Sequence, residues 1–130
     1  MPKFFLFLVA IIWAGCITYF CLIKASAIPV VSIPNIDKCI HAFFYFVLTF
    51  LWFLFFYKQL KLDSIFKPLL FSFMVSFFFG ILIEILQQTF TTTRQADALD
   101  VVANLVGAGL SVIATQLCYN KNLLDSILKK

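Results

Sequence analysis

Four long apolar segments limit what this chain can fold into. They cover residues 4–23, 39–57, 68–90 and 98–119, and each is close to the roughly 20 residues that an α-helix needs to cross a bilayer. The apolar residues are continuous rather than alternating, which favours helices over strands. Helices also satisfy their own backbone hydrogen bonds in lipid. The sequence therefore predicts an all-α fold, a four-helix transmembrane bundle with helices at about 4–23, 38–57, 68–90 and 97–119.

The composition excludes an ordinary soluble domain. Of the 130 residues, 63% are hydrophobic and 12% are charged, whereas soluble domains are about 45–50% apolar and about 25% charged. The length predicts a single integral membrane domain over residues 1–130. In the tail, residues 120–130, apolar and basic positions separate onto two helical faces. We expect either a short amphipathic helix at the membrane surface or a frayed end.

Basic residues concentrate at one end of the predicted bundle, and such residues mark the cytoplasmic side of a membrane protein. The richer end carries Lys3, Lys58, Lys61, Lys67, Lys121, Lys129 and Lys130. The other end carries Lys24, Lys38 and Arg94. This distribution predicts that both termini are cytoplasmic. It also accounts for the net charge of +4 without nucleic-acid binding, which we do not expect.

The cysteines lack the spacing of metal ligands, and we expect buried, inert thiols. They are Cys16, Cys21, Cys39 and Cys118. One alternative is that Ala14-Gly15-Cys16 is a lipoprotein cleavage site. Trp13 occupies the position where such sites usually carry leucine, and the apolar segment continues to Ile23. A signal sequence should have a shorter apolar region, so we favour a complete first helix.

Polar residues open the second apolar segment. Asp37, His41 and Tyr45 are spaced by four and share one helical face, with Lys38 beside them. Asp37 has a simple structural interpretation, because an acid in the first turn is stabilised by the helix dipole. His41 is either a buried imidazole satisfied by a carboxylate or a functional group. Tyr45 is either packing or part of the same site.

Glu84 is the most costly residue of the third segment, because a carboxylate at membrane depth must be paired or protonated. Gln87 and Gln88 follow it by three and four residues, which extends the polar stripe. One interpretation is a structural ion pair with Lys38 or Arg94. The other is a role in handling protons or in binding a cation or ligand.

A polar stripe also runs along the fourth segment at helical spacing, through Asp97, Asp100, Asn104, Gly107 and Ser111. Helix capping alone can account for Asp97, but not for Asn104 one turn deeper. Gly107 and Gly109 predict close contact with another helix. Arg94 precedes the stripe, and its guanidinium suits a carboxylate or phosphate, although an ion pair with Asp97 or a headgroup contact is an equal alternative.

Together these blocks resemble the VanZ-like family. The resemblance covers residues 35–111 and rests on Asp37-Lys38-x-x-His41-x-x-x-Tyr45, Gly80-x-x-x-Glu84-x-x-Gln87/Gln88 and Arg94-x-x-Asp97-x-x-Asp100-x-x-x-Asn104-x-x-Gly107. The family consists of small bacterial integral membrane proteins, named for a member linked to teicoplanin resistance. The resemblance implies a multi-pass protein of the bacterial cytoplasmic membrane with a link to glycopeptide tolerance or envelope homeostasis. It implies no particular reaction.

Three functions remain open. The first is a polar pocket in the outer leaflet that binds a lipid-linked cell-wall precursor or an anionic headgroup, with membrane lipids as its partners. The second is a membrane-embedded hydrolase or transferase that uses His41, Glu84 and Asp100, with or without a divalent cation. The third is a proton-coupled transporter, for which four helices are few unless the protein forms homo-oligomers. Each requires His41, Glu84 and Asp100 to lie near one another.

Overall fold

The computed structural model describes residues 2–22, 36–60, 64–90, 98–122 and 124. Its helices are α1 (Lys3–Leu22), α2 (Ile36–Leu60), α3 (Phe66–Phe90) and α4 (Ala98–Asn120), and these ranges contain no strand. Each helix holds a stretch long and apolar enough to cross a membrane, at Lys3–Cys21, Lys38–Leu60, Phe66–Thr89 and Leu99–Asn120. The predicted four-helix transmembrane fold is confirmed.

Two helices extend beyond their predicted bounds by two residues or more. Helix α2 begins at Ile36 and continues to Leu60, past the apolar segment at both ends. Helix α3 begins at Phe66, whose backbone N–H donates to the Ser64 hydroxyl at 3.2 Å. This side chain caps the helix. Pro68 then falls in the first turn, where its missing N–H costs no hydrogen bond.

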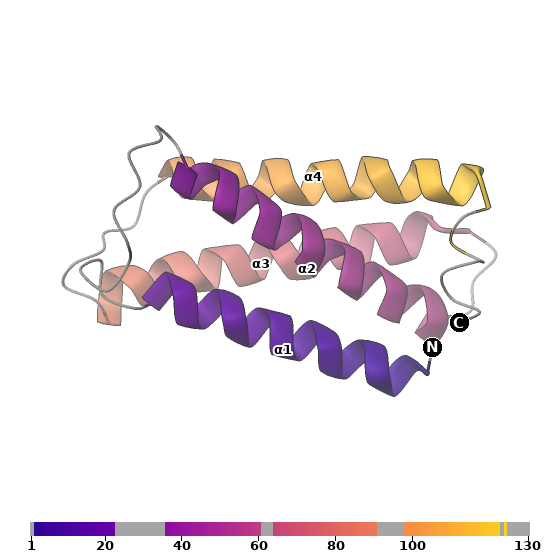
Figure 1. The fold of residues 1–130 in the computed structure, drawn as a ribbon, viewed down its shortest axis with the longest axis horizontal. Helices are drawn as coiled ribbons and strands as arrows, with labels where there is room; N and C mark the ends of the chain where they lie inside the picture. The colour runs from indigo at the N-terminus through magenta and orange to yellow at the C-terminus, as the bar shows by residue number, and fades with distance from the viewer. Residues whose placement is uncertain (1, 23–35, 61–63, 91–97, 123, 125–130) are drawn as a thin grey trace.

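The helices alternate in direction, so the start of α1 and the end of α4 lie at the same end of the bundle (Figure 1). Helix α2 packs against each of the other three helices, most extensively against α4. At Gly107, a Cβ would stand 2.0 Å from the Ala42 carbonyl oxygen, so only glycine permits this approach. The same prediction is wrong for Gly109, where a Cβ would meet nothing within 4 Å. Gly109 is two residues from Gly107, about 200° around the helix, so it lies on the opposite side of α4.

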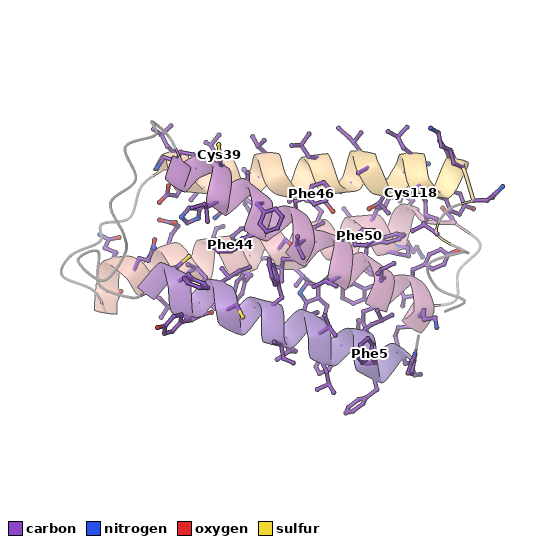
Figure 2. The ribbon with its side chains drawn as sticks, viewed as in Figure 1. Phe5, Cys39, Phe44, Phe46, Phe50 and Cys118 are labelled. Atoms are coloured by element: carbon purple, nitrogen blue, oxygen red, sulfur yellow. The ribbon has the colours of Figure 1, made fainter. Side chains whose placement is uncertain are left out.

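Two apolar cores fill the bundle. One lies at the end shared by the start of α1 and the end of α4, and we call it the closed-end core; it comprises Leu6, Phe53, Leu54, Ile65, Leu69 and Leu124. The other comprises Ile17, Cys21, Tyr45, Leu48 and Ile83. Beside this second core, Phe44 lies on the side of α2 that faces α1 (Figure 2). The Trp13 indole N–H of α1 donates to the Phe44 carbonyl oxygen at 2.9 Å.

Large apolar side chains cover the outside of all four helices, as Phe4, Phe43, Phe78 and Val106 illustrate. In a soluble protein such a surface would aggregate, whereas in a bilayer it contacts acyl chains. The expected burial of the cysteines is wrong for two of them, because Cys16 and Cys39 are exposed on this surface. Figure 2 shows Cys39 on the outer side of α2, near its start. Cys21 is buried and Cys118 is half-buried.

A turn ends α4 and returns the chain toward the bundle. Asn122 has a φ of 59°, and its N–H donates to the Tyr119 carbonyl oxygen at 3.0 Å. A left-handed asparagine is a common helix terminator. Leu124 is then buried in the closed-end core. Apart from this residue, the predicted amphipathic segment after Asn122 lies outside the described residues.

Candidate functional site

Four polar side chains of α2 and α4 meet away from the closed-end core. We call them the polar cluster: Lys38, His41, Asp100 and Asn104. The Lys38 ammonium pairs with Asp100 Oδ1. His41 Nε2 lies 3.9 Å from Asp100 Oδ2, and His41 Nδ1 lies 3.2 Å from Asn104 Oδ1. One helical turn separates the members on each helix, so the close contact of α2 with α4 brings the two stripes face to face.

The bond to Asn104 fixes which ring nitrogen of His41 carries a proton. An amide oxygen can only accept, so His41 Nδ1 must donate. His41 Nε2 is then directed at the Asp100 carboxylate. Their separation of 3.9 Å exceeds a hydrogen bond. It is a distance at which an intervening water or ligand atom joins two polar groups.

Burial differs across the polar cluster. Relative to full exposure, His41 is 6%, Asp100 9% and Asn104 4% exposed. The Lys38 side chain is 23% exposed, so Lys38 forms the accessible edge of the cluster. An unpaired charge in the bundle would be costly. The Lys38 ammonium therefore supplies the opposite charge that stabilises the Asp100 carboxylate beside His41.

Residues of α3 form a second buried group next to the polar cluster. Glu84 is 6% exposed and interacts electrostatically with Tyr45 of α2. The Tyr45 hydroxyl is buried and has no hydrogen-bond partner among the described residues. Gln87 Nε2 donates to the Cys21 carbonyl oxygen at 2.7 Å. Because Cys21 is in the last turn of α1, its carbonyl lacks an intrahelical partner, and Gln87 ties α3 to the end of α1.

Gly80 of α3 lies where the two groups meet. A Cβ at this position would stand 3.1 Å from Asn104 Nδ2 and 3.3 Å from Tyr45 Cε1. The absence of a side chain therefore lets α3 approach α2 and α4 together. Through Asn104, which is bonded to His41, the polar cluster adjoins Tyr45 and its neighbour Glu84.

The predicted site residues fall into four groups. Lys38, His41, Asp100 and Asn104 meet, while Tyr45, Glu84 and Gln87 are buried in the bundle. Gln88 is exposed, so Gln87 is the glutamine of the interior. The backbone of Asp37 is in α2, but its side chain, Arg94 and Asp97 lie outside the described residues.

Sequence reasoning missed a polar contact deeper in the bundle. The Thr49 hydroxyl donates to Ser76 Oγ at 2.8 Å, and both residues are buried. The signal was present on α3, where Ser72, Ser76, Gly80 and Glu84 recur every four residues. Such a stripe of small and polar residues identifies the face that packs against other helices.

No three histidine, cysteine or acidic side chains gather to hold a metal ion in the part of the chain that the structure describes. Comparison with protein-family models, with curated proteins and with solved structures found no match. The VanZ-like resemblance stays a prediction from the motifs.

Proposed function

We propose that this protein is a multi-pass bacterial envelope protein that binds the anionic headgroup of an outer-leaflet lipid at the polar cluster. The lipid would be a lipid-linked cell-wall precursor or an anionic phospholipid. The observation that carries the proposal is the placement of a partly exposed Lys38 side chain, paired with Asp100, at the edge of a cluster whose other members are buried.

The chemistry of Lys38 supports anion binding. An ammonium has three donors, so it can contact a phosphate oxygen while it remains paired with Asp100. The pairing holds the long lysine side chain in one place, which reduces the entropy lost on binding. The distribution of basic residues favours an orientation with this end in the outer half of the membrane.

The closed-end core favours binding over transport. Leu6, Phe53, Leu69 and Leu124 pack at the end opposite the polar cluster. A polar solute that entered at the cluster would meet this apolar layer before it crossed the bundle. The resemblance to the VanZ-like family supports a role in glycopeptide tolerance, because the namesake member is linked to teicoplanin resistance.

The proposal is tested by titrating the purified protein in detergent with phosphatidylglycerol and with zwitterionic phosphatidylcholine of the same chains. We expect tighter binding of phosphatidylglycerol and a loss of about fivefold in Lys38→Gln, which corresponds to one basic contact. The control is Lys67→Gln, an exposed lysine at the other end. Equal binding of the two lipids, or an unchanged affinity in Lys38→Gln, contradicts the proposal.

A hydrolase or transferase is the second candidate, favoured by the gap of 3.9 Å between His41 Nε2 and Asp100 Oδ2. A water or substrate hydroxyl in this gap would contact both a base and a carboxylate. Release of phosphate from an isoprenoid pyrophosphate, lost in His41→Ala, would identify catalysis. Binding without release would leave the first proposal in place.

A further inference from the structure

A narrow, partly open crevice lies between α3 and α4, with a volume of about 10 Å³, which is room for about one oxygen-sized atom. Its sides include Phe77, Val101 and Leu105, which are half-buried, and its inner part includes the buried residues Ser76 and Asn104. The neighbouring side chains Phe78 and Val102 are exposed on the surface that contacts acyl chains. The crevice therefore combines apolar walls with a polar interior, next to the lipid-facing surface.

The inner part of the crevice presents hydrogen-bond donors. Asn104 Nδ2 is buried and has no hydrogen-bond partner among the described residues, although Asn104 Oδ1 is bonded to His41. A buried amide donor without a partner is costly. Ser76 Oγ accepts from Thr49, which leaves the Ser76 proton for another acceptor. Gly80 keeps the space beside Asn104 Nδ2 open.

We infer that this crevice is a lateral binding site for the ester carbonyl of a diacyl lipid, whose acyl chain lies along Phe77, Val101 and Leu105. The inference deepens the proposed function and rests on it for the headgroup, which would occupy the polar cluster. It names the lipid class, because an isoprenoid-linked precursor has no ester carbonyl at this position.

The chemistry of the crevice favours a neutral carbonyl oxygen. Asn104 and Ser76 are uncharged donors, and a charged group would be costly among apolar walls.

The test compares a diester phosphatidylglycerol with the diether lipid that has the same headgroup and chains but no carbonyl. Apparent affinities are measured by native mass spectrometry of the detergent-solubilised protein. We expect the diester to bind roughly three- to tenfold more tightly, the effect of one net hydrogen bond. Equal affinity for the two lipids overturns the inference, since water or an acyl chain alone would then explain the crevice.

Variants test whether the preference for the diester lipid arises at the crevice. Gly80→Ala puts a Cβ 3.1 Å from Asn104 Nδ2, and Asn104→Leu removes the donor at similar volume; both should bring the diester-to-diether ratio to about one. The control Gly109→Ala, whose Cβ meets nothing within 4 Å, should keep the ratio. Thermal unfolding identifies any variant that fails to fold, and a ratio that persists in a folded Asn104→Leu overturns the inference.

The proposed headgroup site and the proposed carbonyl site can be disproved independently of each other. Lys38→Gln should weaken the diester and the diether phosphatidylglycerol equally and leave their ratio unchanged. If neither lipid binds better than phosphatidylcholine, the proposed headgroup site is wrong. The ratio of diester to diether phosphatidylcholine then still decides whether the crevice binds a carbonyl.

Discussion

Gly107 of α4 lies directly against the backbone of Ala42 in α2, so that a Cβ on the glycine would stand 2.0 Å from the Ala42 carbonyl oxygen. Ala42 follows His41, and Gly107 lies one turn beyond Asn104. The contact therefore sets the distance between α2 and α4 next to the hydrogen bond that joins His41 to Asn104.

Gly107→Ala should destabilise the bundle, because the added methyl group requires α2 and α4 to separate. We expect a loss of about 1–3 kcal/mol, as for other overpacked sites, measured by unfolding in mixed detergent micelles. Gly109→Ala is the matched control, since its Cβ meets nothing within 4 Å. It should change stability by less than about 0.5 kcal/mol. Similar effects of the two substitutions would contradict the close α2–α4 contact.

Gln87→Leu should destabilise the protein by about 0.5–1.5 kcal/mol, because it removes the hydrogen bond from Gln87 Nε2 to the Cys21 carbonyl oxygen. Gln88→Leu serves as the control, because Gln88 is exposed and its substitution should leave stability nearly unchanged. Unfolding curves of the two variants in the same detergent compare them directly. A larger loss in Gln88→Leu would show that α3 is rotated relative to this structure.

Lys38→Met and Asp100→Asn should each destabilise the protein by about 1–3 kcal/mol, because each removes one member of a partly buried ion pair. The double variant should lose less than the sum of the two single losses. A double-mutant cycle of unfolding free energies measures this coupling. Additive losses would mean that Lys38 and Asp100 do not interact.

Cys39 offers a test of orientation. It is exposed and follows Lys38 near the start of α2, at the end predicted to face outward. A membrane-impermeant maleimide should label Cys39 in intact cells, while Cys118, half-buried near the opposite end, stays unlabelled. Cys39→Ser should abolish the signal. Labelling of Cys39 only after the cells are opened would reverse the predicted topology.

Apolar length and helical spacing were sufficient to predict most of the fold and part of the candidate site. The four spans follow from the apolar segments, because a helix satisfies its own backbone hydrogen bonds in a bilayer. The inward face of α4 follows from its polar stripe, of which Asp100, Asn104 and Ser111 are buried. Such costly residues have few stable positions in a membrane other than the bundle interior.

Neighbouring residues on one helix were harder to separate. Gln87 and Gln88 differ by about 100° around α3, and the sequence left both open as members of the site. The same limit produced the wrong expectation for Gly109 beside Gly107. The exposed cysteines were missed because lipid, unlike water, makes little distinction between a thiol on the surface and one in the core. The crevice depends on how α3 and α4 pack, which no spacing in either helix specifies.

The most direct test of the central claim is nitrogen–phosphorus dipolar NMR on the protein in phosphatidylglycerol bilayers. With lysine side chains labelled at Nζ, we expect one lysine signal to show dipolar coupling to the phosphorus of a bound phosphate. This coupled signal should be absent in Lys38→Gln. The signal should persist in Lys67→Gln. If the Lys38 signal shows no coupling to phosphorus, the polar cluster does not bind a lipid headgroup.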